Sequence, residues 1–189
     1  MKNILITLAL LISFSSLSQS DLKSTFDRDL NNFYDFTNNK EYDKLLDLMN
    51  PKLFQLASRE QMIQTFESLE SMGMNVITGL AVITNISEII NFEEYKYCRV
   101  YYEGDMTMQI SGQLLSGIDN MKEFVNAEWS PKSVSVEFDE STNTFYIKRL
   151  QQSMIAAAKA KSNDWRYIEF KNMQLLQQII PLEVIEKLK

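Results

Sequence analysis

The sequence contains no histidine. Ser-His-Asp and Cys-His nucleophilic systems use an imidazole as the general base, and many zinc sites take histidine ligands. The absence therefore excludes these hydrolases and histidine metal sites. No other motif indicates a metal or a cofactor, so we expect neither.

Cys98 is the only cysteine, so no internal disulfide can form. A domain exported without disulfides must be stabilised by its core. Cys98 falls among the apolar residues of an alternating segment, and a buried cysteine behaves as a small hydrophobic side chain. We therefore expect an inert thiol rather than a nucleophile.

Long apolar runs are also scarce, and the one that exists lies at the N-terminus. Residues 4–14 are apolar except for Thr7 and Ser13, follow Lys2, and precede four serines between residues 15 and 20. The run is too short to span a bilayer, which needs about 20 residues. This order is typical of a cleavable secretory signal peptide. We expect cleavage after Ser20, with Ser18 as the alternative, and a periplasmic or secreted protein.

Proline and glycine are few, with three and five residues. No repeat, low-complexity tract or flexible linker interrupts the chain, and residues 21–189 have the length of one domain. We therefore predict a signal peptide over residues 1–20 and a single domain over residues 21–189, without stable membrane insertion.

Basic residues are outnumbered, 19 to 25. Removal of residues 1–20, whose one charged residue is Lys2, changes the net charge from −6 to −7. Nucleic-acid binding depends on neutralising phosphates with Lys and Arg, and anionic membranes also attract basic surfaces. We therefore expect no nucleic-acid partner. The partner classes that remain are a small apolar ligand and another protein. We expect the chain to be a monomer or a homodimer.

Helical spacing dominates the first third of the domain. It predicts helices over residues 21–37 and 41–49, and a third helix opened by a capping box of Ser58 and Gln61. The residues expected to be buried on the third helix are Met62, Ile63, Phe66 and Leu69.

After residue 73, the apolar residues recur at every second position instead of every third or fourth. Residues 74–83 are rich in β-branched side chains, and residues 95–110 alternate between an apolar and a more polar set. Gly104 within the second run indicates a bulge or bend. A tight hairpin at residues 103–105 remains the alternative.

The rest of the chain mixes short helices and strands. We predict a helix over residues 119–127 and a hairpin of residues 133–138 with 144–149. Residues 153–160 fit a helix by alanine content, but a hairpin with residues 165–170 is favoured. The expected buried side of the short helix is Ile118, Met121, Phe124 and Val125.

Two features of the C-terminal region concern the core. Trp165 opens an apolar-rich strand and is expected to be buried. Helical spacing resumes near Leu175, and Pro181 suits the first turn of a last short helix. This apolar tail is expected to pack back onto the domain or onto a second copy of the chain.

N-terminal helices followed by antiparallel strands make an α+β layout. This layout resembles the nuclear-transport-factor-2-like (NTF2-like) superfamily, also described as a ketosteroid-isomerase-like or cystatin-like α+β cone. The resemblance implies helices packed on a strongly curved antiparallel sheet, an internal pocket and a short C-terminal helix. Members include isomerases, dehydratases and binding modules, so the fold does not specify a function. The segments that carry the resemblance are Phe33-Tyr34, 42–49 before Pro51, 95–110, Trp165 and 179–185.

The resemblance also suggests catalytic candidates. Isomerases of this superfamily use a carboxylate base with a tyrosine and a protonated acid as hydrogen-bond donors. Tyrosines that alternate on a strand commonly pack on a sheet face, however, and Glu103 and Asp105 are expected to meet water. The weak candidates are Tyr42, Tyr97, Tyr101, Glu103 and Asp105.

Tyr97, Arg99 and Tyr101 share one face of the long strand. A guanidinium between aromatic rings can bind a carboxylate or stack on a planar ligand, although such a row can also be an ordinary cross-strand ladder. We predict an exported, non-catalytic domain that binds a small apolar ligand or a protein partner in or around a cone-shaped pocket. The alternatives are a histidine-free isomerase or hydratase using Asp or Glu with Tyr, and a structural domain with a filled core.

Overall fold

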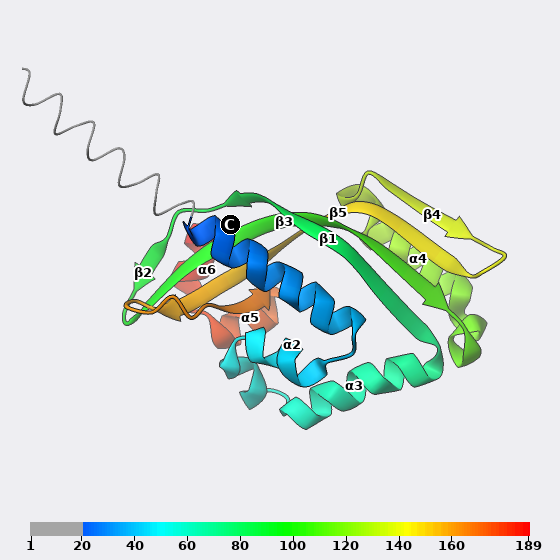
Figure 1. The fold of residues 1–189 in the computed structure, drawn as a ribbon, viewed down its shortest axis with the longest axis horizontal. Coiled ribbons are helices and arrows are strands. Elements are labelled where there is room, and N and C mark those ends of the chain that lie inside the picture. The colour runs from blue at the N-terminus through cyan, green and yellow to red at the C-terminus, as the bar shows by residue number, and fades with distance from the viewer. Residues whose placement is uncertain (1–20) are drawn as a thin grey trace, which may run out of the picture.

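The computed structural model describes residues 21–189 and shows an α+β fold, as expected. N-terminal helices pack against a strongly curled antiparallel sheet that forms a half-barrel, and short helices close the chain (Figure 1). The signal peptide expected over residues 1–20 lies outside the described residues. Within the described part of the chain, no helix has the length and apolar composition needed to cross a membrane.

The N-terminal helical region begins with a helix over residues 21–38 and continues through short elements. The capping box is present: Gln61 N donates to Ser58 Oγ at 3.2 Å, and Ser58 N donates to Gln61 Oε1 at 2.9 Å. Gly73 ends the third helix with a φ of 110°, a left-handed conformation that favours glycine. The remaining elements are α2 (Tyr42–Leu48), the 3-10 helix η1 (Pro51–Gln55) and α3 (Arg59–Met72).

The prediction that α3 buries four apolar side chains is wrong. Met62, Ile63, Phe66 and Leu69 all remain partly exposed, and α3 has no fully buried residue. The apolar stripe exists, but Met62, Phe66 and Leu69 line a cavity, so none of the three is fully covered. The sequence pattern identifies the apolar face of α3, but it does not indicate which element would cover that face.

The sheet has six antiparallel strands in the order β1-β3-β5-β4, and β2 and β6 pair with β3 and β5. Its two longest strands, β3 and β5, form the centre, so one curved surface extends along the whole domain. The segment over residues 153–160 is part of β5 and forms a hairpin with β6, the arrangement favoured from the sequence. The strands are β1 (Met74–Ile86), β2 (Ile90–Phe92), β3 (Tyr95–Ile110), β4 (Ser135–Asp139), β5 (Thr144–Lys159) and β6 (Arg166–Glu169).

Gly104 marks the bend in this sheet. The alternative hairpin at residues 103–105 is wrong, because β3 continues through Gly104 and pairs with β5 on both sides. The expected bulge is present, but the extra residues lie in the neighbouring strands β1 and β5, where Arg149 has a φ of 49°. A Cβ on Gly104 would lie 3.3 Å from Tyr34 Cε2. The glycine therefore lets the N-terminal helix approach the bend closely.

One face of the sheet packs against residues 21–38. Phe26, Leu30 and Tyr34 meet a set on β3 that includes Cys98. Trp165 is 2% exposed, as expected, and its ring makes an edge contact with Phe26 at a centroid distance of 5.1 Å. These contacts attach the N-terminal helix to the sheet.

The opposite face of the sheet packs against α5 (Met173–Ile179) and α6 (Leu182–Leu188), which Figure 1 shows behind the strands. Val184 and Ile185 are fully buried against a group that includes Ile155 and Ile168. The tail therefore packs back onto its own domain, one of the two expected arrangements.

A third group of core residues lies under α4 (Ile118–Glu128), which follows the 3-10 helix η2 (Gly112–Gly117) and precedes the 3-10 helix η3 (Ser130–Lys132). Val125 is fully buried, as expected, but Phe124 is 47% exposed. The prediction for Phe124 is wrong: its ring lies near the surface, with Trp129 as an edge contact at a centroid distance of 5.8 Å.

Cys98 is fully buried, and burial raises the pKa of its thiol to about 12. The thiolate is the reactive form of cysteine. We therefore expect a maleimide dye to label the native protein negligibly in mildly alkaline buffer, and to add one label per chain after unfolding in guanidinium. Mass spectrometry distinguishes the two states. Rapid labelling of the folded protein would contradict the buried position.

Candidate functional site

An apolar cavity of about 530 Å³ lies between the sheet and the first helices. Tyr102, Met154 and Tyr167 contribute from β3, β5 and β6, and the wall opposite comes from residues 21–38, α2 and α3. The apolar side chains that face it include Leu30, Phe33, Leu45, Met62, Phe66 and Leu69.

The local sequence explains why this cavity has apolar walls. Met62, Phe66 and Leu69 recur at the spacing that places side chains on one helix face, and that face of α3 is directed toward the sheet. Tyr102 on β3 and Met154 on the neighbouring strand β5 lie on the sheet face that also meets residues 21–38. The N-terminal helix covers only part of this face, so the space beyond it stays open between α3 and the strands.

Tyr42 and Glu70, which both line the cavity, form a tyrosine–carboxylate pair. The Tyr42 hydroxyl donates to Glu70 Oε1, and Lys40 Nζ lies 2.8 Å from Glu70 Oε2. Burial alone would raise the pKa of Glu70, but the hydrogen bonds from Lys40 and Tyr42 and the charge of Lys40 outweigh it and lower that pKa. Burial and the bond to Glu70 raise the pKa of Tyr42.

This pair does not fit the isomerase alternative. A carboxyl group is the most effective general acid or base when its pKa lies near the working pH, whereas the pKa of Glu70 is lowered. The other tyrosines of the cavity also have hydrogen-bond partners: Tyr167 Oη donates to Asp29 Oδ2 at 2.6 Å, and Tyr102 Oη donates to Gln152 Oε1 at 3.1 Å. Both hydroxyls therefore already have protein acceptors.

A second, more polar pocket of about 400 Å³ lies along the outer edge of β5. This edge pairs with β4 up to Lys148 and with β6 from Met154 onward. The pocket occupies the stretch between these partners and is lined by Gln151, Gln152 and Ser153. Its remaining lining residues are Arg99, Tyr101, Met106, Trp129, Lys132, Leu150, Glu169, Phe170 and Lys171.

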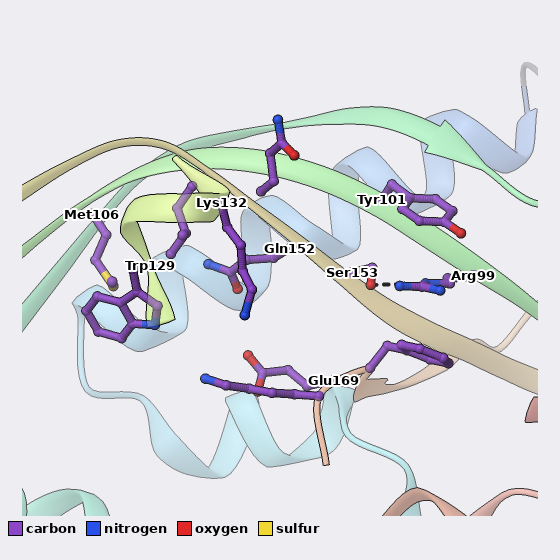
Figure 2. Close-up of a pocket in the computed structure, with 12 residues that line it drawn as sticks. Arg99, Tyr101, Met106, Trp129, Lys132, Gln152, Ser153 and Glu169 are labelled. Carbon is purple, nitrogen blue, oxygen red and sulfur yellow. Dashed lines mark hydrogen bonds between the residues drawn. The ribbon is translucent and has the colours of Figure 1, made fainter. Parts of the chain in front are cut away.

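Arg99 extends into this pocket, where its Nε donates to Ser153 Oγ at 3.1 Å (Figure 2). The guanidinium carbon lies 4.6 Å from the centre of the Tyr101 ring and 3.7 Å from that of Phe170. Arg99 Nη1 also donates to the carbonyl oxygen of Leu188 at 3.1 Å. The arginine is therefore held between two aromatic rings.

Tyr97 was expected to share this role with Arg99 and Tyr101, but the structure places it elsewhere. Tyr97 is only 3% exposed and packs among the residues that α5 and α6 cover. It lines neither of the two cavities described above. Phe170 supplies the second ring beside Arg99.

Glu103 and Asp105 lie at the bulge, away from both cavities. Glu103 Oε1 is 2.8 Å from Arg149 Nη2, and Asp105 Oδ2 is 2.9 Å from Lys148 Nζ. The hydrogen bond from Lys148, together with one from Arg149 N, lowers the pKa of Asp105. These carboxylates hold the backbone around Arg149, so the five catalytic candidates do not form one site.

The sequence pattern does not indicate several of the residues that line the cavities. Glu70 and Lys132 carry no motif, and Glu169 ends the short strand β6 with no distinguishing neighbours. The apolar stripe of α3 was the one usable signal, and it was interpreted as core. Strand register and helix placement bring these residues together, and neither can be read from local sequence.

In the described residues, no group of three or more Cys, Asp or Glu side chains is placed to hold a metal ion. The sequence matches no family model, and no significantly similar curated protein or solved structure was found. Membership of the NTF2-like superfamily therefore stays a proposal that rests on the layout of the chain.

Proposed function

We propose that this protein is an exported, non-catalytic domain of the NTF2-like kind that binds a small apolar ligand in the cavity between α3 and the sheet. The observation that carries this proposal is the open apolar space itself. Its volume, about 530 Å³, falls within the roughly 300–1,000 Å³ range of small-molecule sites.

The partly exposed side chains of α3 support the same conclusion. Apolar surface removed from water stabilises a complex by roughly 25 cal/mol per Å², and Met62, Phe66 and Leu69 leave part of that surface uncovered. The tyrosines around the cavity already have hydrogen-bond partners. Recognition therefore depends mainly on shape and apolar contact, and the open space counts against a structural domain with a filled core.

The neutral dye N-phenylnaphthylamine, which fluoresces in apolar surroundings, tests this proposal. We expect saturable fluorescence with the wild-type protein. Leu69→Glu should weaken binding by about tenfold or more, because a charge in an apolar site is costly to desolvate. Circular dichroism establishes that the variant is folded.

Leu80→Glu is the matched control, because Leu80 is 83% exposed on β1 and does not line the cavity. Its dye affinity should equal that of the wild type. Fluorescence that rises without saturation, or equal binding by a folded Leu69→Glu variant, would overturn the proposal.

A further inference from the structure

We infer that the ligand is an amphiphile whose apolar body occupies the cavity beside α3 and whose anionic head occupies the polar pocket along β5. This inference rests on the proposed function and adds the chemical class of the ligand. Three observations carry it: the two spaces adjoin, their linings differ in polarity, and the polar pocket has an excess of positive charge.

The two spaces adjoin at the end of β6. Glu169 and Lys171 line both of them. On the neighbouring strand, Met154 faces the apolar cavity and the preceding residue, Ser153, faces the polar pocket. The proposed ligand would pass from one space to the other around the end of β6, where Glu169 and Lys171 border both.

The linings of the two spaces differ in polarity, as the apolar body and the polar head of an amphiphile require. The cavity beside α3 is walled mainly by leucine, methionine and phenylalanine side chains. The pocket along β5 presents amide, hydroxyl and charged groups from Gln151, Gln152 and Ser153 among others. Figure 2 shows Lys132 extending toward Glu169, with Trp129 and Met106 at the far side of the pocket.

The charge of the polar pocket is opposite to that of the protein. The chain has a net charge of −6, but the pocket gathers Arg99, Lys132 and Lys171 against the single carboxylate of Glu169. Within residues 21–189, no acidic side chain forms an ion pair with Arg99 or Lys171, and Lys132 Nζ lies 3.6 Å from Glu128 Oε2. Lys132 is thus paired with Glu128, and Arg99 already donates to Ser153 and Leu188, but the lining still holds three cations against one carboxylate. An oxyanion accepts charge-assisted hydrogen bonds from such cations.

The head is therefore a carboxylate or a phosphate, which share this chemistry. Displacement of bound N-phenylnaphthylamine by dodecyl compounds of equal chain length separates the head from the body. We expect dodecanoate or dodecyl phosphate to compete better than dodecanol by about fivefold or more, and dodecyltrimethylammonium to compete worst. The stronger of the two anions identifies the head.

The double variant Lys132→Gln/Lys171→Gln tests the pocket directly. It should abolish the preference for anions, measured as the ratio of the affinities for dodecanoate or dodecyl phosphate and for dodecanol in the same variant. Lys161→Gln/Lys187→Gln removes the same charge at two exposed lysines outside both cavities, and should keep the preference.

The two levels of the proposal fail in different ways. Equal competition by dodecanol and both anions, or equal loss of anion preference in the two double variants, would overturn the anionic head while leaving the apolar site intact. No saturable dye binding to the wild-type protein would overturn the apolar site and this inference with it.

Discussion

Replacing Trp165 by alanine is expected to lower the free energy of unfolding by ~3–5 kcal/mol, the range for removal of a large buried aromatic side chain. Trp165 is 2% exposed, and its ring contacts Phe26 of the N-terminal helix. Lys96 Nζ lies above the same ring, 4.9 Å from its centre. The substitution therefore leaves a void where the N-terminal helix meets the sheet.

Urea denaturation followed by circular dichroism measures this loss. Phe124→Ala is the control, because it also removes an aromatic side chain but from a position that is 47% exposed. It should cost under about 1 kcal/mol. A comparable loss in the two variants would contradict the role assigned to Trp165.

Removing residues 181–189 is expected to have the larger effect and to leave a chain that no longer melts cooperatively. The deletion exposes the surface that Val184, Ile185 and Leu188 cover, and Arg99 loses its acceptor at Leu188. Each such side chain contributes about 2–5 kcal/mol by truncation to alanine, so the sum approaches the ~5–15 kcal/mol stability of a typical domain. Differential scanning calorimetry measures the transition.

The point variant Ile185→Ala keeps this prediction testable if the truncated chain does not fold. It should cost about 2–5 kcal/mol. Leu182→Ala, on the same helix but 54% exposed, should change stability by no more than about 0.5 kcal/mol. Melting temperatures should not depend on protein concentration, because the tail is buried within one chain. Conversion of a dimer to a stable monomer by the deletion would contradict this packing.

The candidate site was predicted only where its residues are neighbours on one strand. Arg99 and Tyr101 were expected to act together, and both line the polar pocket. Tyr97 was grouped with them because residues two apart share a strand face. Further along the same face, however, α5 and α6 cover Tyr97 and leave Tyr101 accessible to the pocket. Alternation identifies a face and does not indicate how far a covering helix extends.

The polar candidates show the same limit. Glu103 and Asp105 were expected to meet water, and the side chain of Asp105 is 45% exposed. Both also form ion pairs, with Arg149 and Lys148, around the bulge in β5, which the sequence did not indicate. Gly104 indicated an irregularity at this point, but the extra residues belong to the neighbouring strands. Their positions depend on pairing between distant segments, which the pattern of a single strand does not contain.

Local interactions were thus sufficient for the α+β class, the capping box of α3, the uninterrupted run of β3 and the burial of Trp165. Each follows from hydrogen bonds between near neighbours or from the period of the apolar residues, which short segments specify. The packing of distant segments determined that α3 stands off from the sheet and borders an open cavity, and that cations from β3, η3 and the segment after β6 gather beside it. These outcomes depend on strand register and on how much of a face each helix covers, and both are set by long-range contacts.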